Sequence, residues 1–486
     1  MAKRTSDAAG ISESNGKVQD RGQGIPREGQ KVDDEMGEFE DRWEDDIESE
    51  EDMQEGENDD FTPAMEDDQP SQPRKQTYLP GTKLDADEQL TPDLSVYLLL
   101  HSLSYAWPCL SFDILHDDLG SSRTSYPHTA FIVSGTQAGT IPGQGRAKDE
   151  VVIMRLSGLS KTQQFSDSDS ENESNDENDI EEDSKLDFLT IPHIGNVNRI
   201  RAAPTLLNST IPDPYHVATF SETGKVHIFD VRPYIDTLSG PSKPRQKVPI
   251  HTINNHDRSE GFALEWGQSG LLSGDCDGKI YRTVLTETGF KTEQKSFLGH
   301  ENSVEDIQWS PNEMGVFASC SADKTVKMWD VRQRSKPALS VMAHDEDVNV
   351  ISWNKEVDYL LVSGGDEGGI KVWDLRMFKQ QPSPVAHFTW HTAPITSVEW
   401  DPNDSSVFAA SGADDQLTLW DLSVEQDDDE VPISSQDGQN LSIPPQLLFV
   451  HQGQRDVKEL HWHPQIPGVV ISTASDSFNV FRTISS

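Results

Sequence analysis

Residues 299–330 read GHENSVEDIQWSPNEMGVFASCSADKTVKMWD and contain the pattern that decides the fold. The segment opens on Gly299-His300, closes on Trp329-Asp330, and holds short runs of alternating apolar residues between polar turns. Residues 343–374 and 390–421 follow the same pattern, and the successive closing tryptophans are 44 and 47 residues apart. Units of about 40–45 residues with a Gly-His start and a Trp-Asp end are typical of the blades of a β-propeller.

Weaker copies of this unit extend the repeat on both sides. They share a leading histidine and start at His193, His256 and Val450-His451. The strands expected at 129–134 and 151–156 supply one more, atypical blade. A single blade cannot bury both of its faces, so blades stack around an axis and close into a ring. The sequence therefore predicts an all-β fold, a seven-bladed WD-repeat β-propeller over residues 107–486.

The segment before the repeats, residues 90–106, is predicted to form an N-terminal α-helix. Thr91 and Pro92 suit the N-cap and the first helical position. Four residues follow at helical spacing, namely Leu94, Tyr97, Leu98 and His101. The helix should end before Pro108. Residues 110–114 then alternate as a strand, and we expect this strand to lie at the outer edge of the last blade and close the ring.

Several repeats carry histidine, serine and aspartate together, a combination that resembles a catalytic set. The first set comprises His300, Ser319 or Ser321, Asp323 and Trp329, and the set in blade six comprises His391, Ser411, Asp414 and Trp420. Blade five has His344 and Trp373, with Glu367 at the position of the turn aspartate. An active site needs one such set, so several copies indicate a structural role. We predict that the protein is not an enzyme.

Other sites of chemistry are not expected. The sequence lacks a phosphate-binding G-x-x-x-x-G-K-[ST] loop and an H-E-x-x-H zinc motif. Asp275, Asp277 and Gly278 weakly resemble a calcium loop but lack its downstream glutamate, so we assign them to a turn. The three cysteines form no C-x-x-C pair. No metal or other cofactor is predicted. The polar N-terminus and the lack of a bilayer-length apolar run favour a soluble intracellular protein that does not contact a membrane.

The charge is strongly negative and unevenly distributed. The formal net charge is −44, with 20 carboxylates in residues 33–68, 10 in 165–184 and five in 425–430. Residues 1–80 are too polar to bury a core and are predicted to be a disordered acidic tail. Such a field repels phosphate backbones, so direct nucleic-acid binding is not expected. It attracts basic partners such as histones or ribosomal proteins.

Two acidic insertions, residues 160–186 and 424–445, interrupt the blades. In the first, Ser166, Ser168 and Ser170 each precede an acidic residue by three positions, a pattern that acid-directed kinases prefer. The alternative is an unmodified solvated loop. The second insertion contains acids and then an apolar end, IPPQLLF at 443–449, and loops of this kind often bind partners.

Longer strings of residues indicate a family. The strings LLLHSLSYAWPCLSFDIL (98–115), HIGNVNRIRAAP (193–204) and IPPQLLFVHQG (443–453) resemble the histone-binding WD proteins of chromatin-assembly complexes. The strings SEGFALEW (259–266), FASCSADKTVKMWD (317–330), VFAASGADDQLTLWDL (407–422) and FVHQGQRDVKELHWHPQ (449–465) are closer to the glutamate-rich WD-repeat family. The resemblance covers residues 78–486 and leaves the tail and the acidic loops outside it.

This resemblance implies a ribosome-assembly factor of the nucleus and nucleolus, with a possible cytoplasmic pool. Its expected partners are a basic large-subunit ribosomal protein of the L-three type and pre-ribosomal particles, and the protein itself is expected to be a monomer. Two alternatives remain open, a histone chaperone or chromatin-assembly subunit and a substrate receptor in ubiquitin ligation. In the histone-binding proteins the N-terminal helix and the loop before the last blade clasp a histone helix.

The candidate partner-binding residues come from these two segments. They are Leu94, Tyr97, Leu98, His101, Asp428, Asp429, Pro444, Pro445 and Leu447. The alternative for the helix is that its apolar face simply docks against the propeller.

Overall fold

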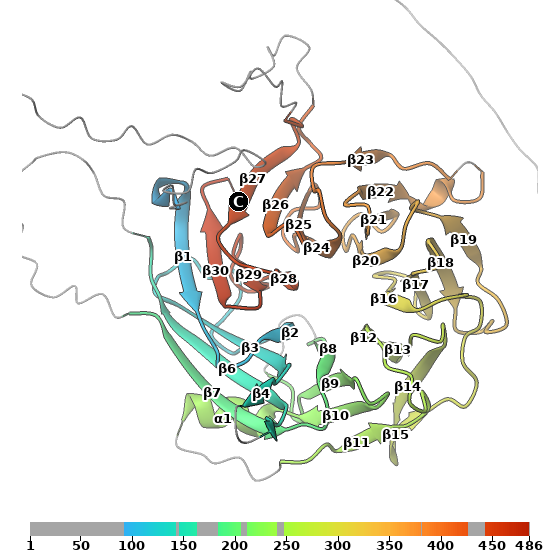
Figure 1. The fold of residues 1–486 in the computed structure, drawn as a ribbon, viewed down its shortest axis with the longest axis horizontal. Coiled ribbons are helices and arrows are strands. Elements are labelled where there is room, and N and C mark those ends of the chain that lie inside the picture. The colour runs from blue at the N-terminus through green and yellow to red at the C-terminus, as the bar shows by residue number, and fades with distance from the viewer. Residues whose placement is uncertain are drawn as a thin grey trace, which may run out of the picture. The chain divides into compact units, whose positions relative to one another are not determined.

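Seven four-stranded antiparallel sheets form a closed ring in the computed structural model (Figure 1). The structure describes residues 92–141, 145–162, 183–205, 211–240, 247–380, 382–425 and 443–485. The predicted tail and the three candidate phosphorylation serines lie outside these residues, as does most of both acidic insertions. Within the described residues, the predicted seven-bladed propeller is confirmed.

The strands of each blade follow one another from the centre of the ring outward. Blade 1 contains β2 (Cys109–Leu115), β3 (His128–Thr136), β6 (Glu150–Leu159) and β7 (Lys185–Pro192), and blade 2 contains β8 (Val197–Ala202), β9 (His216–Ser221), β10 (Val226–Asp230) and β11 (His251–Ile253). Blade 3 contains β12 (Ala263–Gly267), β13 (Gly270–Gly274), β14 (Ile280–Thr286) and β15 (Gly289–Thr292). Blade 4 contains β16 (Val304–Trp309), β17 (Val316–Ser321), β18 (Thr325–Asp330) and β19 (Leu339–Met342).

The last three blades follow the same order. Blade 5 contains β20 (Val348–Trp353), β21 (Leu360–Gly365), β22 (Ile370–Asp374) and β23 (Ala386–Phe388), and blade 6 contains β24 (Ile395–Trp400), β25 (Val407–Gly412), β26 (Gln416–Asp421) and β27 (Leu447–Gln452). Blade 7 contains β28 (Glu459–Trp462), β29 (Val470–Thr473), β30 (Phe478–Thr483) and, at its outer edge, β1 (Tyr97–Leu103).

A few short elements lie outside the blades. They are a small hairpin of β4 (Thr140–Ile141) and β5 (Gly145–Arg146), the helix α1 (Arg232–Ser239), and two 3-10 turns, η1 (Leu94–Val96) and η2 (Leu375–Met377). Helix α1 connects β10 to β11, and the guanidinium of Arg155 in β6 donates to its Leu238 carbonyl at 2.7 Å. This bond ties the end of α1 in blade 2 to blade 1.

The predicted N-terminal helix is not present in the described part of residues 90–106. Asp93 caps the single turn η1 by accepting from the Ser95 amide at 3.0 Å, and the chain then becomes the strand β1. Tyr97, Leu99 and Leu103 of β1 are buried while their neighbours are partly exposed. The run of apolar residues at 96–100 fits a helix and a strand equally well in sequence, and the free edge of β30 decides in favour of the strand.

The ring is closed by an N-terminal strand, as predicted, but by a different one. β1 pairs antiparallel with β30, placing Leu100 opposite Phe481 and Leu103 opposite Phe478. The predicted closing strand at 110–114 lies within β2, the innermost strand of blade 1. Blade 1 needs this strand because the repeat pattern supplies it only with β3 and β6, the strands predicted at 129–134 and 151–156, and with β7.

The hydrophobic core is divided among the spaces between neighbouring blades. Leu99 of blade 7 and Phe112 of blade 1 belong to one cluster, and Trp353 and Trp373 of blade 5 pack with strands of blade 4 in another. Each blade therefore buries its faces against two neighbours. The cluster between blades 7 and 1 depends on β1, because Leu99 and Leu103 belong to that strand.

Replacing Leu99 by alanine should therefore lower the free energy of unfolding by about 2–5 kcal/mol, since this side chain is fully buried. The measurement is urea-induced unfolding followed by tryptophan fluorescence. Leu98→Ala is the matched control, because Leu98 is partly exposed and should cost clearly less. Equal losses in the two variants would contradict the strand assignment.

Candidate functional site

The histidine sets of the repeats are structural hydrogen-bond networks. In blade 4, His300 contacts the Asp323 carboxylate through Nδ1 at 2.8 Å and the Ser319 hydroxyl through Nε2 at 2.6 Å. The Trp329 indole N–H donates to the same hydroxyl at 2.8 Å. Ser319 is fully buried, and its oxygen already accepts from tryptophan. It cannot reach a substrate, so the arrangement supports the blade rather than nucleophilic chemistry.

Blades 3 and 5 repeat the arrangement. His256 contacts Asp275 and Ser273, each at 2.7 Å, so Asp275 belongs to this network and also accepts from the turn amide of Asp277, as its assignment to a turn implies. In blade 5, His344 contacts Glu367 and lies 2.7 Å from the Ser363 hydroxyl, which accepts from Trp373 at 2.9 Å. The glutamate at position 367 therefore replaces the usual aspartate.

Blade 6 corrects one residue of the prediction. His391 contacts Asp414 at 2.9 Å, but its other nitrogen contacts the hydroxyl of Thr418 at 2.9 Å, and Trp420 donates to that same hydroxyl at 2.7 Å. The predicted Ser411 instead contacts Thr396 at 2.8 Å. In blade 4 Ser319 pairs across the strands with Lys327, and the corresponding pair in blade 6 is Ala410 with Thr418. The hydroxyl has therefore moved to the neighbouring strand.

In blade 7 the network uses a residue from β1. The Tyr97 hydroxyl contacts Nδ1 of His451 at 2.8 Å, and Asn479 contacts Nε2 at 3.1 Å. The ring of Phe481 stacks on that of His451 with centroids 4.2 Å apart. Tyr97 was predicted to touch a partner, but it is buried and completes the ring closure. A surface role for this residue is therefore incompatible with the fold.

The two segments predicted to bind a partner do meet at the outer edge of blades 6 and 7. The ring of Tyr97 in β1 lies 5.3 Å from that of Phe449 in β27, in an edge-on arrangement. Val96 and Leu100 pack in the same cluster as Leu448 and Phe449. The apolar end of the second insertion therefore docks beside β1.

The remaining candidate residues are only partly exposed or lie outside the described residues. Leu94, Leu98, His101, Pro444, Pro445 and Leu447 are all intermediate in exposure. His101 is engaged through its Nε2 with the Ser160 carbonyl at 2.9 Å, and Leu447 packs against the cluster of blades 5 and 6. Asp428 and Asp429 lie outside the described residues. The binding role of this edge stays a prediction.

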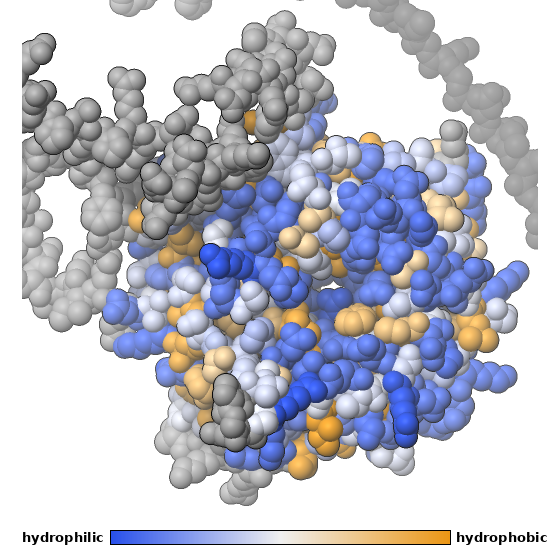
Figure 2. All heavy atoms as spheres, in the orientation of Figure 1, coloured by the Kyte–Doolittle hydropathy of each residue, from blue (hydrophilic) through white to orange (hydrophobic). Residues whose placement is uncertain are grey.

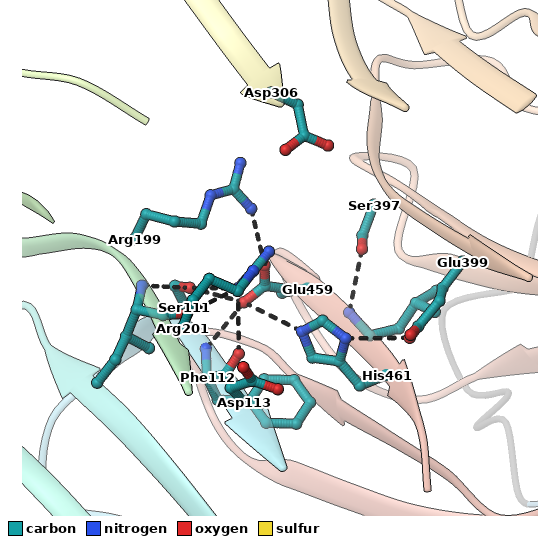
Figure 3. Close-up of polar contacts among 12 residues, drawn as sticks. Ser111, Phe112, Asp113, Arg199, Arg201, Asp306, Ser397, Glu399, Glu459 and His461 are labelled. Atoms are coloured by element: carbon teal, nitrogen blue, oxygen red, sulfur yellow. Dashed lines mark hydrogen bonds and ion pairs between the residues drawn. The ribbon is translucent and has the colours of Figure 1, made fainter. Parts of the chain in front are cut away.

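A second cluster, which the sequence reasoning missed, lies at the centre of the ring (Figure 3). The Glu459 carboxylate in β28 accepts from Arg199 and Arg201 of β8, each at 2.7 Å. Its other oxygen accepts from the Ser111 hydroxyl at 2.7 Å and from the Phe112 amide at 2.8 Å, both in β2. One carboxylate, 1% exposed, therefore joins blades 7, 1 and 2.

His461 extends this central cluster to blade 6. Its Nδ1 contacts the Glu399 carboxylate of β24 at 3.0 Å, and its Nε2 lies 3.8 Å from Glu459. Burial disfavours the imidazolium, but the two carboxylates outweigh burial and raise the pKa of His461 to about 10. Burial likewise favours neutral Glu459, yet Arg201, His461 and Arg199 hold the pKa of that carboxyl well below its ordinary value. His461 and Glu459 are therefore both charged at neutral pH.

Other side chains of the inner strands join neighbouring blades. Their oxygens accept from main-chain amides of the next inner strand, in the pairs Asp113 to Ala202, Asp306 to Ile351, Gln308 to Trp353, Ser397 to Leu460 and Glu399 to Trp462. Glu265 of β12 is less well paired. Burial raises its pKa to about 8, and nearby Asp306 and Asp113 add to the rise. The signal in the sequence was charge at alternate positions of inner strands, as in Arg199 and Arg201.

These side chains stabilise the ring, and nothing in the part of the chain that the structure covers favours a metal or a membrane. No group of three or more His, Cys, Asp or Glu residues among the described residues could hold a metal ion. No described helix is long and apolar enough to cross a membrane.

Two protein-family models match the chain. The model for histone-binding proteins of the RBBP4 type, which includes their counterpart in the CAF1 complex, matches residues 87–160, a range that contains β1 and most of blade 1. The model described as "WD domain, G-beta repeat" matches 291–330, 335–374 and 382–421, the three repeats that end in Trp-Asp.

Curated proteins resemble the chain over most of its length. "Ribosome assembly protein rrb1" of Schizosaccharomyces pombe is 46% identical over 93% of this chain and 94% of its own length. "Glutamate-rich WD repeat-containing protein 1" of Dictyostelium discoideum is 43% identical over 83% of each chain. "Protein HEAT STRESS TOLERANT DWD 1" of Arabidopsis thaliana is 42% identical over 85% of this chain and 92% of its own length.

Replacing Glu459 by glutamine should lower the free energy of unfolding by about 3 kcal/mol or more, because two buried guanidinium groups lose their carboxylate. Urea-induced unfolding measures the loss. Asp187→Asn is the control, since its ion pair with Arg155 is exposed and should contribute less than about 1 kcal/mol. A loss no larger than that of the control would show that the central cluster is not needed for closure.

Stability should also fall on mild acidification. Burial lowers the pKa of His128, His227 and His451 to about 4 and that of His463 to about 3. The unfolded chain binds these protons near pH 6.5, so the stabilisation is complete above pH 6.5 and is lost as the pH falls toward 4. His461 acts oppositely: its contribution is complete below pH 6.5 and is lost as the pH rises toward 10.

The urea midpoint measured at pH 7.5 and at pH 5.5 tests this expectation, with the lower midpoint expected at pH 5.5. In His463→Asn the shift should be smaller, because asparagine can accept the same amide bonds that His463 Nδ1 accepts from Gln465 and Ile466 but does not titrate. A midpoint that does not depend on pH, or a shift unchanged in the variant, would contradict it.

Proposed function

This chain belongs to the glutamate-rich WD-repeat family of the ribosome assembly protein rrb1, and we propose that it is a ribosome-biogenesis factor that chaperones a basic large-subunit ribosomal protein of the L-three type. In this proposal it binds the newly made protein without catalysing a reaction. It then supports assembly of that protein into pre-60S particles, in the nucleus and nucleolus and with a cytoplasmic pool.

The observation that carries the proposal is the 46% identity to the ribosome assembly protein over 93% of this chain. The match runs through the blades and beyond them, so it is not a likeness of the common repeat alone. A ribosome-assembly role accordingly follows from family membership, and the identity of the client is the finer part that we propose.

Charge supports a basic client. An unassembled ribosomal protein is rich in lysine and arginine, and its RNA-binding segments would otherwise bind the wrong RNA or aggregate. A chain of net charge −44 can neutralise such a client while repelling RNA itself. The ring offers a rigid and largely hydrophilic face for this purpose (Figure 2). Long-range attraction of this kind speeds association and weakens as salt screens it.

Affinity purification of the tagged chain from nuclear extract at about 150 mM salt, followed by mass spectrometry, tests the proposal. We expect one large-subunit ribosomal protein to dominate the bound material. A purification that enriches no ribosomal protein would overturn the chaperone role.

The acidic segment at 33–68 should contribute to this binding. Changing its 20 carboxylates to the matching amides keeps the length but removes the charge. The client should then bind more weakly at low salt, and its affinity should depend less on salt concentration. The same purification repeated over a salt series measures the change. Retention equal to that of the unchanged chain at low salt would exclude the segment as a clamp.

A histone-binding role is the second candidate, and one observation favours it. The family model of histone-binding proteins matches residues 87–160, which contain the closing strand β1. Recovery of core histones with chromatin-assembly subunits, without enrichment of ribosomal proteins, would favour this role over ribosome assembly.

A further inference from the structure

A pocket of about 200 Å³ lies where blades 6 and 7 meet, away from the centre of the ring. Its walls come from the turn between β24 and β25, the turn between β28 and β29, the end of β30, and β27. The residues that matter for its chemistry are Asp401, Asp404, Val407, Leu419, Leu448 and Arg482. Sites for drug-sized ligands are usually about 300–1,000 Å³, so this pocket suits a single side chain better.

One wall of the pocket carries two carboxylates without a cationic partner among the described residues. Asp401 accepts from the Asn403 amide at 2.8 Å, and Asp404 accepts from the Ser406 amide at 2.9 Å. In each case the bonds use the Oδ1 oxygen and leave Oδ2 without a hydrogen bond to the described part of the chain. Burial raises the pKa of Asp401, and Asp404 and Glu399 raise it further, which reports uncompensated negative potential at this wall.

The rest of the pocket is apolar except for one guanidinium. Val407, Leu419 and Leu448 supply aliphatic surface from β25, β26 and β27. Arg482, on β30, has a buried Nε with no hydrogen-bond acceptor in the described residues, and it forms no ion pair with either aspartate. A ligand that filled the pocket would need a cationic end for the carboxylates, an aliphatic stem for the floor and an acceptor for Arg482.

We propose that this pocket receives a lysine or arginine side chain of a basic protein partner, with a main-chain carbonyl of the same segment accepting from Arg482. A basic side chain carries both the required cation and the required aliphatic stem. Charge complementarity selects this occupant over a second copy of the chain, whose net charge is −44. The inference rests on the proposed function for the kind of partner and adds the place where one of its side chains binds.

The test uses a blocked lysine peptide whose lysine carries a photoreactive diazirine in its aliphatic stem. The peptide is irradiated with the full-length chain at about 150 mM salt, and the crosslinked residues are identified by mass spectrometry. Position resolves the question, because crosslinks to the acidic segments appear at other residues. We expect crosslinks at the pocket, on the segments that contain Val407 and Leu448.

The decisive variant is Asp401→Asn with Asp404→Asn. Asparagine keeps the Oδ1 acceptor of each turn, so the loop geometry is preserved while two charges are removed. The matched control is Glu301→Gln with Glu313→Gln, which removes two charges at exposed positions on blade 4. Crosslinking at the pocket should fall about fivefold or more in the first variant and stay within about twofold in the control.

Absence of crosslinks at the pocket, or an equal loss in both variants, would overturn the inference. Failure of the inference and failure of the proposed function remain distinguishable. If the ribosomal protein co-purifies equally with the unchanged chain and with the aspartate variant, the pocket is not its binding site and the chaperone function stands. If it does not co-purify with the unchanged chain, the proposed function fails, whatever the crosslinks show.

Discussion

The pairing of β1 with β30 is the interaction on which the ring depends, because it joins segments from opposite ends of the propeller. Tyr97 of β1 completes the histidine network of blade 7, and Leu99 fills the core between blades 7 and 1. At the centre of the ring, Glu459 fastens the same two blades through β2. The seam is thus held at its outer edge by main-chain pairing, in its core by apolar contact, and at its centre by charge.

The repeat could be predicted from the sequence because each blade carries its own markers. The closing tryptophans mark every blade in which they occur, and the networks of His300 and His344 follow from residues within one blade. Blade 6 shows the limit of this reasoning. Ser411 and Thr418 both lie near His391 in sequence, and only the direction of each side chain across the sheet decides that Thr418 completes the network.

The rest of the structure depends on partners that spacing does not reveal. The apolar run at 96–100 suits a helix or a strand, and the choice is made by β30, which lies at the other end of the propeller. The partners of Glu459 lie on β2 and β8, hundreds of residues before it, so no local motif marks the central cluster. The pocket beside Asp401 likewise forms from turns of two blades together with β27 and β30. Each of these features requires the closed ring before it can be recognised.

Closure by β1 also has a consequence for the birth of the protein. Tyr97 and His451, which touch in the finished ring, are 354 residues apart in the chain. During synthesis β1 leaves the ribosome long before its partner strand is made, with Leu99 and Leu103 uncovered and a strand edge unpaired. Contacts between such distant segments form slowly. The nascent chain therefore passes through an interval in which it needs protection itself, and that interval ends when its last blade has been translated.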